Sequence, residues 1–71
     1  MKKTFYYVIE KDADGYYVGT VPELPGCHSQ ARTLGALTKR IKEAIRLYLE
    51  ANKGAIPETE FVGVISIEIA L

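Results

Sequence analysis

The neighbouring pair Cys27 and His28 holds the side chains of this chain that are best suited to nucleophilic chemistry. A catalytic cysteine needs a base within hydrogen-bond reach and surroundings that lower its pKa. Neighbouring residues of a strand point to opposite faces, so these two side chains cannot easily form such a couple. One cysteine and one histidine also supply too few ligands for a four-coordinate zinc site. We therefore expect a small buried Cys27 beside a surface His28, with a zinc site shared between two copies as a less favoured alternative.

Carboxylates form a second candidate site between residues 10 and 23. Four of them stand against one lysine there, a net charge of −3: Glu10, Asp12, Asp14 and Glu23. Carboxylates in such numbers can hold Mg²⁺ for nucleic-acid hydrolysis. Asp12 and Asp14 are, however, of the residue type that ordinary turns favour. We expect a solvated turn first, an acidic docking surface for a basic partner second, and a catalytic metal site last.

Basic side chains gather further along, between residues 32 and 46, where five of them stand against one glutamate: Arg32, Lys39, Arg40, Lys42 and Arg46. Their spacing to Glu43 and Glu50 is that of ion pairs on a solvated helix face. No aromatic residue alternates with these charges to stack bases. Nucleic-acid contact and a protein interface are the less favoured alternatives.

Tyrosines occur as two adjacent pairs, Tyr6-Tyr7 and Tyr16-Tyr17, so each pair places one ring on each face of a sheet. Tyrosine is well suited to interfaces, although core packing explains the pairs equally well. Together with the acids they give the residues that we expect to bind a partner: Glu10, Asp12, Asp14, Tyr16, Tyr17 and Glu23.

No further pattern predicts catalysis. The six glycines are scattered and form no phosphate-binding loop, and neither serine lies between the glycines of a nucleophile elbow. We therefore predict a protein that is not an enzyme and has no catalytic residue, cofactor or bound metal.

The elements that position these residues can be read from periodicity and turn signals. In order, we expect strands over 4–10, 16–21 and 27–32, a helix over 34–52 and a last strand over 61–71. Thr33 is the expected N-cap of the helix and Gly54 its left-handed C-cap. Apolar residues recur along this helix at spacings of three and four: Leu34, Leu37, Ile41, Ala44, Ile45, Tyr48 and Leu49. The fold class is α+β, of order β-β-β-α-β, a mostly antiparallel sheet with one long helix packed on one face.

The last predicted strand has one wholly apolar row of side chains: Phe61, Gly63, Ile65, Ile67, Ile69 and Leu71. The other row begins with Val62 and Val64 and continues with Ser66 and Glu68. The first row must pack on the helix, and we expect another chain to cover part of the second.

Size and composition limit the possibilities further. Seventy-one residues make one small domain that buries only about 60% of its unfolded surface, so we expect association with itself or with a partner to support it. A hydrophobic content of 48% with zero net charge is typical of a folded domain. A single cysteine fits a reducing compartment, and no apolar run approaches the ~20 residues of a membrane span, so the expected location is the cytoplasm with no membrane partner.

These motifs resemble the HicB family of small antitoxins. The resemblance rests on the Asp14-Gly15-Tyr16 hairpin tip, the Pro22-Glu23-Leu24-Pro25-Gly26-Cys27 turn, the stretch 30–34 and the helix over 41–50. It covers nearly the whole chain.

The resemblance implies a partial ribonuclease-H-like fold and an antitoxin function. HicB proteins bind HicA, a very small basic ribonuclease, block its mRNA cleavage, and form dimers or tetramers. Many carry a C-terminal DNA-binding domain, whereas residues 1–71 are predicted to be a single HicB-like domain without one, so direct DNA binding is not expected. The alternative is a stand-alone, sheet-mediated homo-oligomeric adaptor or structural domain with no toxin partner.

Overall fold

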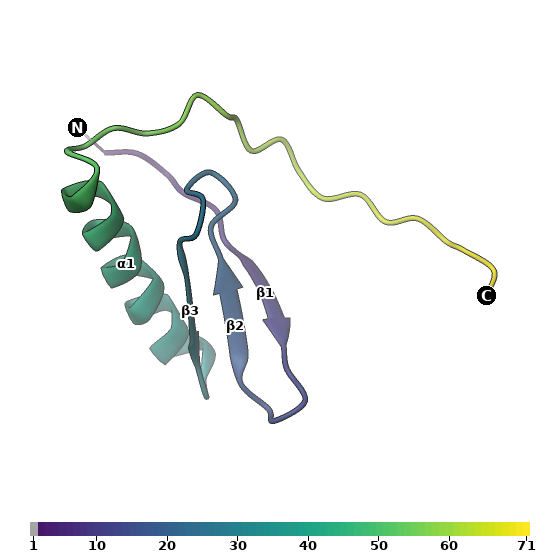
Figure 1. Ribbon diagram of the computed structural model, residues 1–71. Coiled ribbons are helices and arrows are strands. Elements are labelled where there is room, and N and C mark those ends of the chain that lie inside the picture. Colours follow the sequence, from purple (N-terminus) through teal and green to yellow (C-terminus); the bar gives the residue numbers. More distant parts are fainter. Residues whose placement is uncertain (1) are drawn as a thin grey trace.

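Three short antiparallel strands and one long helix make up the fold of residues 2–71, which a computed structural model describes. The strands are β1 (Val8–Lys11), β2 (Tyr17–Thr20) and β3 (His28–Ala31), and the helix is α1 (Leu34–Ala51). The sheet has the order β1-β2-β3, with both strand pairs antiparallel. Figure 1 shows α1 lying against one face of this sheet. The predicted β-β-β-α arrangement is thereby confirmed.

A tight turn joins β1 to β2, as the sequence predicts. The Asp12 carboxylate accepts hydrogen bonds from the backbone N–H groups of Asp14 and Tyr16, at 3.0 and 2.9 Å. Gly15 adopts a positive φ of 86° that a side chain would disfavour. β1 begins at Val8, four residues later than expected. In the observed register Tyr6 would lie opposite Pro22, which has no N–H to continue the ladder.

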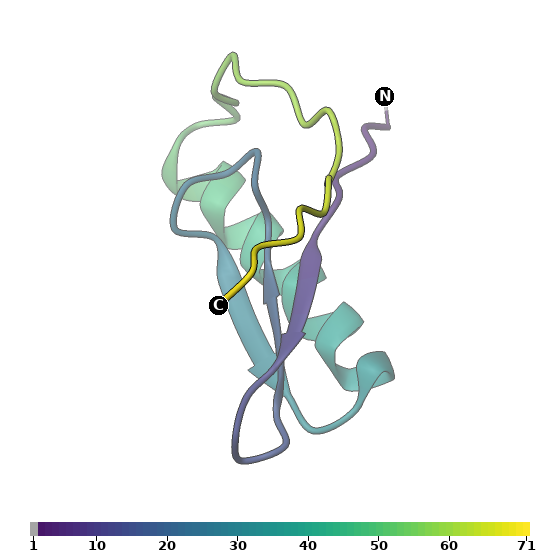
Figure 2. The same ribbon diagram turned by 90° about the vertical axis from the view of Figure 1, so that its right-hand side faces the viewer.

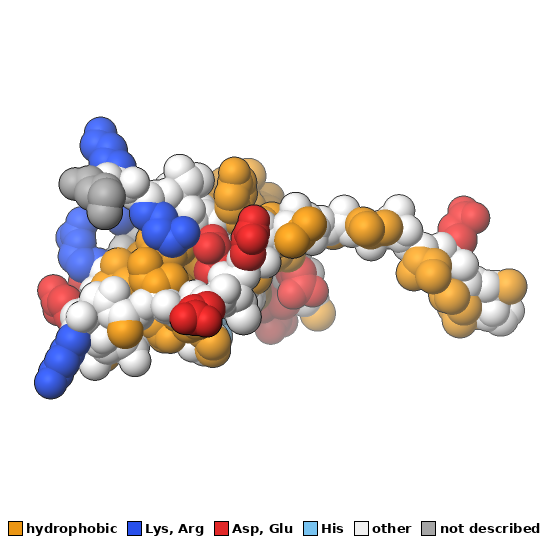
Figure 3. All heavy atoms as spheres, turned by 90° about the horizontal axis from the view of Figure 1, so that it is seen from above, with side chains coloured by type: hydrophobic (Ala, Val, Ile, Leu, Met, Phe, Trp, Pro, Cys, Tyr) orange, Lys and Arg blue, Asp and Glu red, His pale blue; other side chains and the backbone are white. Residues whose placement is uncertain are grey.

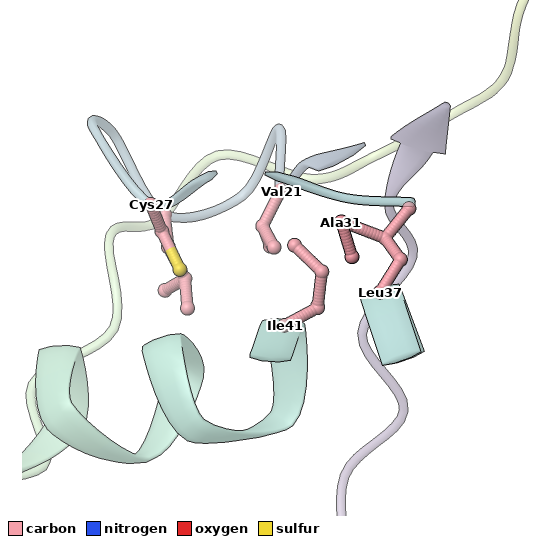
Figure 4. Close-up of a cluster of buried hydrophobic side chains, with 6 residues drawn as sticks. Val21, Cys27, Ala31, Leu37 and Ile41 are labelled. Atoms are coloured by element: carbon pink, nitrogen blue, oxygen red, sulfur yellow. The ribbon is translucent and has the colours of Figure 1, made fainter. Parts of the chain in front are cut away.

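The loop between β2 and β3 consists of two consecutive turns. The Leu24 N–H donates to the Val21 carbonyl at 3.2 Å, and the Cys27 N–H donates to the Leu24 carbonyl at 3.0 Å. Gly26 has a φ of +79°, the value that a type II turn with Pro25 before it requires. The two turns direct Val21, Leu24 and Cys27 into the core, and Figure 4 shows Val21 and Cys27 pointing toward the helix.

The ends of α1 follow the predicted signals with one change. The Thr33 hydroxyl caps the helix by accepting from the Ala36 N–H at 3.1 Å. At the other end Lys53, not Gly54, is the first residue in the left-handed region, with a φ of 53°. Gly54 comes next and its N–H donates to the Leu49 carbonyl at 2.7 Å, which completes a Schellman motif.

The core lies between α1 and the strands β2 and β3. Leu37 and Ile41 are the buried residues of the helix, whereas Leu34, predicted to share their stripe, is 51% exposed because it lies in the first turn beyond the sheet. Gly19 of β2 permits the close approach: a Cβ there would lie 3.0 Å from Ile41 Cδ1 and 3.3 Å from Tyr7 Cδ2. The helix contacts β3 and β2 but leaves β1 largely uncovered.

Residues 61–71 differ from the expectation of a fourth sheet strand. They run away from the domain as an extended segment that belongs to no ladder of the described residues (Figures 1 and 2). The radius of gyration is consequently 13.8 Å, against about 11 Å for a compact chain of this length. The predicted fourth strand is therefore not formed, and residues 61–71 pair with no strand among residues 2–71.

The contact at Gly19 gives a stability prediction. Gly19→Ala should lower the free energy of unfolding by about 1–3 kcal/mol, because the new methyl group would displace Ile41 and Tyr7. Gly35→Ala is the control: nothing lies within 4 Å of its Cβ position, and alanine in a helix gains up to about 1 kcal/mol over glycine. Urea denaturation at one protein concentration measures both. An unchanged midpoint for Gly19→Ala would contradict the helix–sheet packing described here.

Candidate functional site

Cys27 and His28 do not form a catalytic pair. Cys27, the last residue of the β2–β3 loop (residues 21–27, the proline loop), is buried, and burial raises the pKa of its thiol above the ordinary value. A raised pKa keeps the sulfur protonated at neutral pH and therefore poorly nucleophilic. His28 begins β3 with an exposed side chain. The cysteine accordingly acts as a small apolar core residue, as the sequence predicts.

The hairpin tip exposes three of the predicted acids. Glu10 and Asp14 both lie in exposed positions beside the β1–β2 turn. The Asp12 carboxylate is also exposed, but its Oδ1 atom holds the two turn hydrogen bonds. Glu10 and Asp14 are therefore the carboxylates of the tip available to a partner, and Asp12 fixes the loop that carries Asp14.

Glu23 lies apart from the other acids. It belongs to the proline loop, at the opposite end of the strands from the hairpin tip (Figure 1). Its side chain is only 9% exposed, and its Oε2 atom lies 3.4 Å from the Lys3 ammonium group. Asp12, Asp14 and Glu23 consequently cannot hold one metal ion together. Throughout residues 2–71 the structure contains no group of three side chains suited to a metal.

The tyrosine pairs divide between the two faces of the sheet, and the register decides which ring points where. Tyr7 and Tyr17 pack beside the core on the helix side, and the Tyr7 hydroxyl lies 2.8 Å from Thr38 Oγ1. Tyr16 lies on the opposite, outer face, where the Arg32 guanidinium covers its ring at 4.4 Å and donates to its hydroxyl at 3.0 Å. Tyr6 is 56% exposed.

The six predicted partner-binding residues thus do not share one surface. Glu10, Asp14 and Tyr16 gather at the tip and the outer face, Tyr17 faces the helix and Glu23 is remote. On the helix, Glu43 and Arg46 form one of the expected ion pairs at 3.8 Å, with both side chains well exposed. That exposure agrees with a solvated face.

Sequence reasoning missed an apolar groove between α1 and the N-terminal segment. It encloses about 400 Å³, with a floor of Phe5, Ile41, Ile45 and Leu49 and a basic rim of Lys3, Lys42 and Arg46. The helical stripe contains three of the floor residues, but the stripe alone does not show that the sheet covers Ile41 and leaves Ile45 and Leu49 only partly covered. The groove exists because α1 packs on β2 and β3 and extends past β1.

The fold and its surfaces define a small α+β domain whose exposed features are an acidic turn, an open strand edge and apolar surface. Such features are typical of surfaces that bind other macromolecules. Within residues 2–71, no helix is long and apolar enough to cross a bilayer.

Comparison with known families agrees with this class. The HicB_like antitoxin of bacterial toxin-antitoxin systems matches residues 5–68, and the chain belongs to that family. A UPF0150 protein of Archaeoglobus fulgidus is 57% identical over 65 residues, which cover 92% of this chain and 93% of the relative. UPF0150 proteins of Synechocystis and Thermotoga maritima are 43% identical over 63 residues and 36% identical over 70, covering 89% and 97% of this chain and 90% and 93% of the relatives.

The burial of Cys27 predicts a slow thiol. In the folded protein an aromatic disulfide reagent should react with Cys27 roughly 100-fold more slowly than in denaturant, a factor that corresponds to a local opening of about 2.7 kcal/mol. The variant Cys27→Ala/Lys39→Cys is the control, because position 39 lies on an exposed part of the helix. Equal rates for Cys27 and the position-39 thiol would contradict the core assignment.

Proposed function

We propose that this protein neutralises a small, basic, HicA-like ribonuclease by binding the toxin and masking its active site. Membership of the HicB-like antitoxin family over residues 5–68 is the observation that carries the proposal. In this role the protein is not an enzyme, uses no cofactor and does not contact DNA directly. It acts in the cytoplasm, where the mRNA targets of such a toxin lie.

The hairpin tip is the surface that we assign to the toxin. Glu10 and Asp14 are exposed there, and the turn bonded by Asp12 holds the loop in one conformation. A preformed acidic loop attracts a basic partner and loses little conformational entropy on binding. Tyr16, held under the Arg32 guanidinium on the outer face, supplies a rigid aromatic contact beside the acids.

Glu23 and Tyr17 are not part of the proposed contact surface. Glu23 is buried and paired with Lys3, and Tyr17 packs against the core. Of the six predicted residues, we retain Glu10, Asp14 and Tyr16 as toxin contacts, with Asp12 as the residue that positions Asp14.

Co-expression tests the proposal. We expect the full chain to form a stable complex with a small basic ribonuclease encoded beside its gene, and to restore the growth that the ribonuclease alone abolishes. Purified complex should show no mRNA cleavage. A neighbouring ribonuclease that stays active and unbound in the presence of this chain would contradict the proposal.

Charge reversal tests the assigned surface. Glu10→Lys/Asp14→Lys should lower the association rate constant with the toxin by about tenfold at low salt, because steering by the acids is lost. The control Glu50→Lys/Glu58→Lys makes the same change in charge at exposed positions away from the tip. Surface plasmon resonance at two salt concentrations measures both, and equal losses for the two variants would place the contact elsewhere.

The exposed segment 61–71 favours a second property, assembly with further copies of the same chain. A homodimer or tetramer is compatible with toxin binding. Without a toxin partner it would leave the alternative function of a homo-oligomeric adaptor.

A further inference from the structure

We propose that residues 61–71 form the fourth strand of a second copy's sheet, added to the outer edge of β1, and that two copies exchange this C-terminal segment reciprocally. The inference concerns assembly and does not depend on the toxin. It identifies the segment, the edge and the groove through which a dimer forms.

The first observation is the apolar surface of the segment itself. Its residues alternate as a strand does, and its large apolar side chains project into solvent in the single chain: Val62, Val64, Ile65, Ile67, Ile69 and Leu71 are between 68% and fully exposed. Figure 3 shows these side chains along an arm that extends well clear of the domain. An exposed apolar run of this length marks a surface that binds a partner.

The second observation is an open sheet edge of suitable composition. All four residues of β1 are exposed, and its outer edge presents backbone groups that pair with no strand among the described residues. Val8 and Ile9 are 38% and 44% exposed. The other edge strand, β3, reads His28-Ser29-Gln30-Ala31 and has only one apolar side chain, so β1 is the edge better suited to an apolar strand.

The third observation is the apolar groove beside this edge. A strand added next to β1 lies over the part of the helix face that the three-stranded sheet leaves bare. The groove floor there is Phe5, Ile41, Ile45 and Leu49. The wholly apolar row of the segment, with Ile65, Ile67 and Ile69 at its centre, has the length and chemistry to cover that floor.

The path of the segment directs it to another copy. Phe61 stacks on Tyr6 with ring centroids 5.3 Å apart, and residues 62–64 pass beside Val8 and Pro22. The Tyr7 ring faces the helix, so its neighbour Tyr6 points to the outer face of the sheet. The segment therefore leaves along the outer face of its own sheet and does not lie beside its own β1 edge. Figure 2 shows it in front of the strands, with α1 behind them. In a dimer with a two-fold axis, each segment pairs with the β1 edge of the other copy, so both segments are covered.

The test is the mass of the full chain in solution, by light scattering coupled to size-exclusion chromatography. We expect twice the 7.9 kDa of one chain. Ile67→Lys should weaken the dimer at least about tenfold in dissociation constant, because a charge in the apolar row must enter the groove. Ser66→Lys is the matched control, since it adds the same charge one residue away in the other row and should leave the dimer intact.

The receiving surface is tested by a second pair. Leu49→Lys in the groove floor should dissociate the dimer, and Leu47→Lys, on an exposed part of the same helix, should not. Circular dichroism confirms that α1 remains folded in each variant.

Three results would overturn the inference. A monomeric wild-type chain at tens of micromolar would show that the segment folds back on its own domain or stays unpaired. A dimer unaffected by Ile67→Lys would be formed through another surface. Equal effects of Leu49→Lys and Leu47→Lys would exclude the groove. Toxin binding by the monomeric Ile67→Lys variant is measured separately, so failure of the exchange and failure of the proposed function are distinguishable.

Discussion

The close packing of α1 on β2 is the constraint on which the rest of this structure depends. Gly19 has no side chain, and Ile41 occupies the space that one would fill. The helix is thereby fixed over β2 and β3, where Leu37 and Ile41 complete the core with residues from the proline loop. Because one helix cannot also cover a third strand fully, β1 and the outer part of the helix face are left without a cover.

That incomplete cover connects the fold to its function. A domain this small gains little stability from its own core. Its remaining apolar surfaces contribute to stability only when a partner covers them. The exposed surfaces of the domain differ in chemistry. The hairpin tip is acidic and rigid, which suits a basic partner, whereas the β1 edge and the groove are apolar and suit a strand of another chain. The two proposals are therefore compatible, because assembly through the β1 edge would leave the hairpin tip exposed.

Local signals in the sequence predict the local structure well. The Asp12 turn, the Pro25-Gly26 turn, the Thr33 cap and the extent of α1 each depend on a few neighbouring residues, and the structure confirms them. The helix C-terminus shows the limit, because Lys53 takes the left-handed position one residue before the glycine that favours it.

The candidate site was less predictable because it depends on contacts between distant residues. The residues next to Glu23 do not indicate that Lys3, twenty residues away, lies beside it, so the sequence predicts an exposed acid where the structure has a buried one. Strand periodicity places one tyrosine of each pair on each face, but only the register assigns Tyr17 to the core and Tyr16 to the outer face. The segment 61–71 has the alternation of a strand, and that pattern does not say which chain supplies its partner.

Amide hydrogen exchange in residues 61–71 of the full chain tests the central claim, that this segment is a strand completed by a second copy. At concentrations where the chain is dimeric, we predict slow exchange for alternate amides between Gly63 and Ile69, with protection that is lost on dilution. Exchange of all these amides at the rate of an unstructured peptide, at every concentration, would contradict the account.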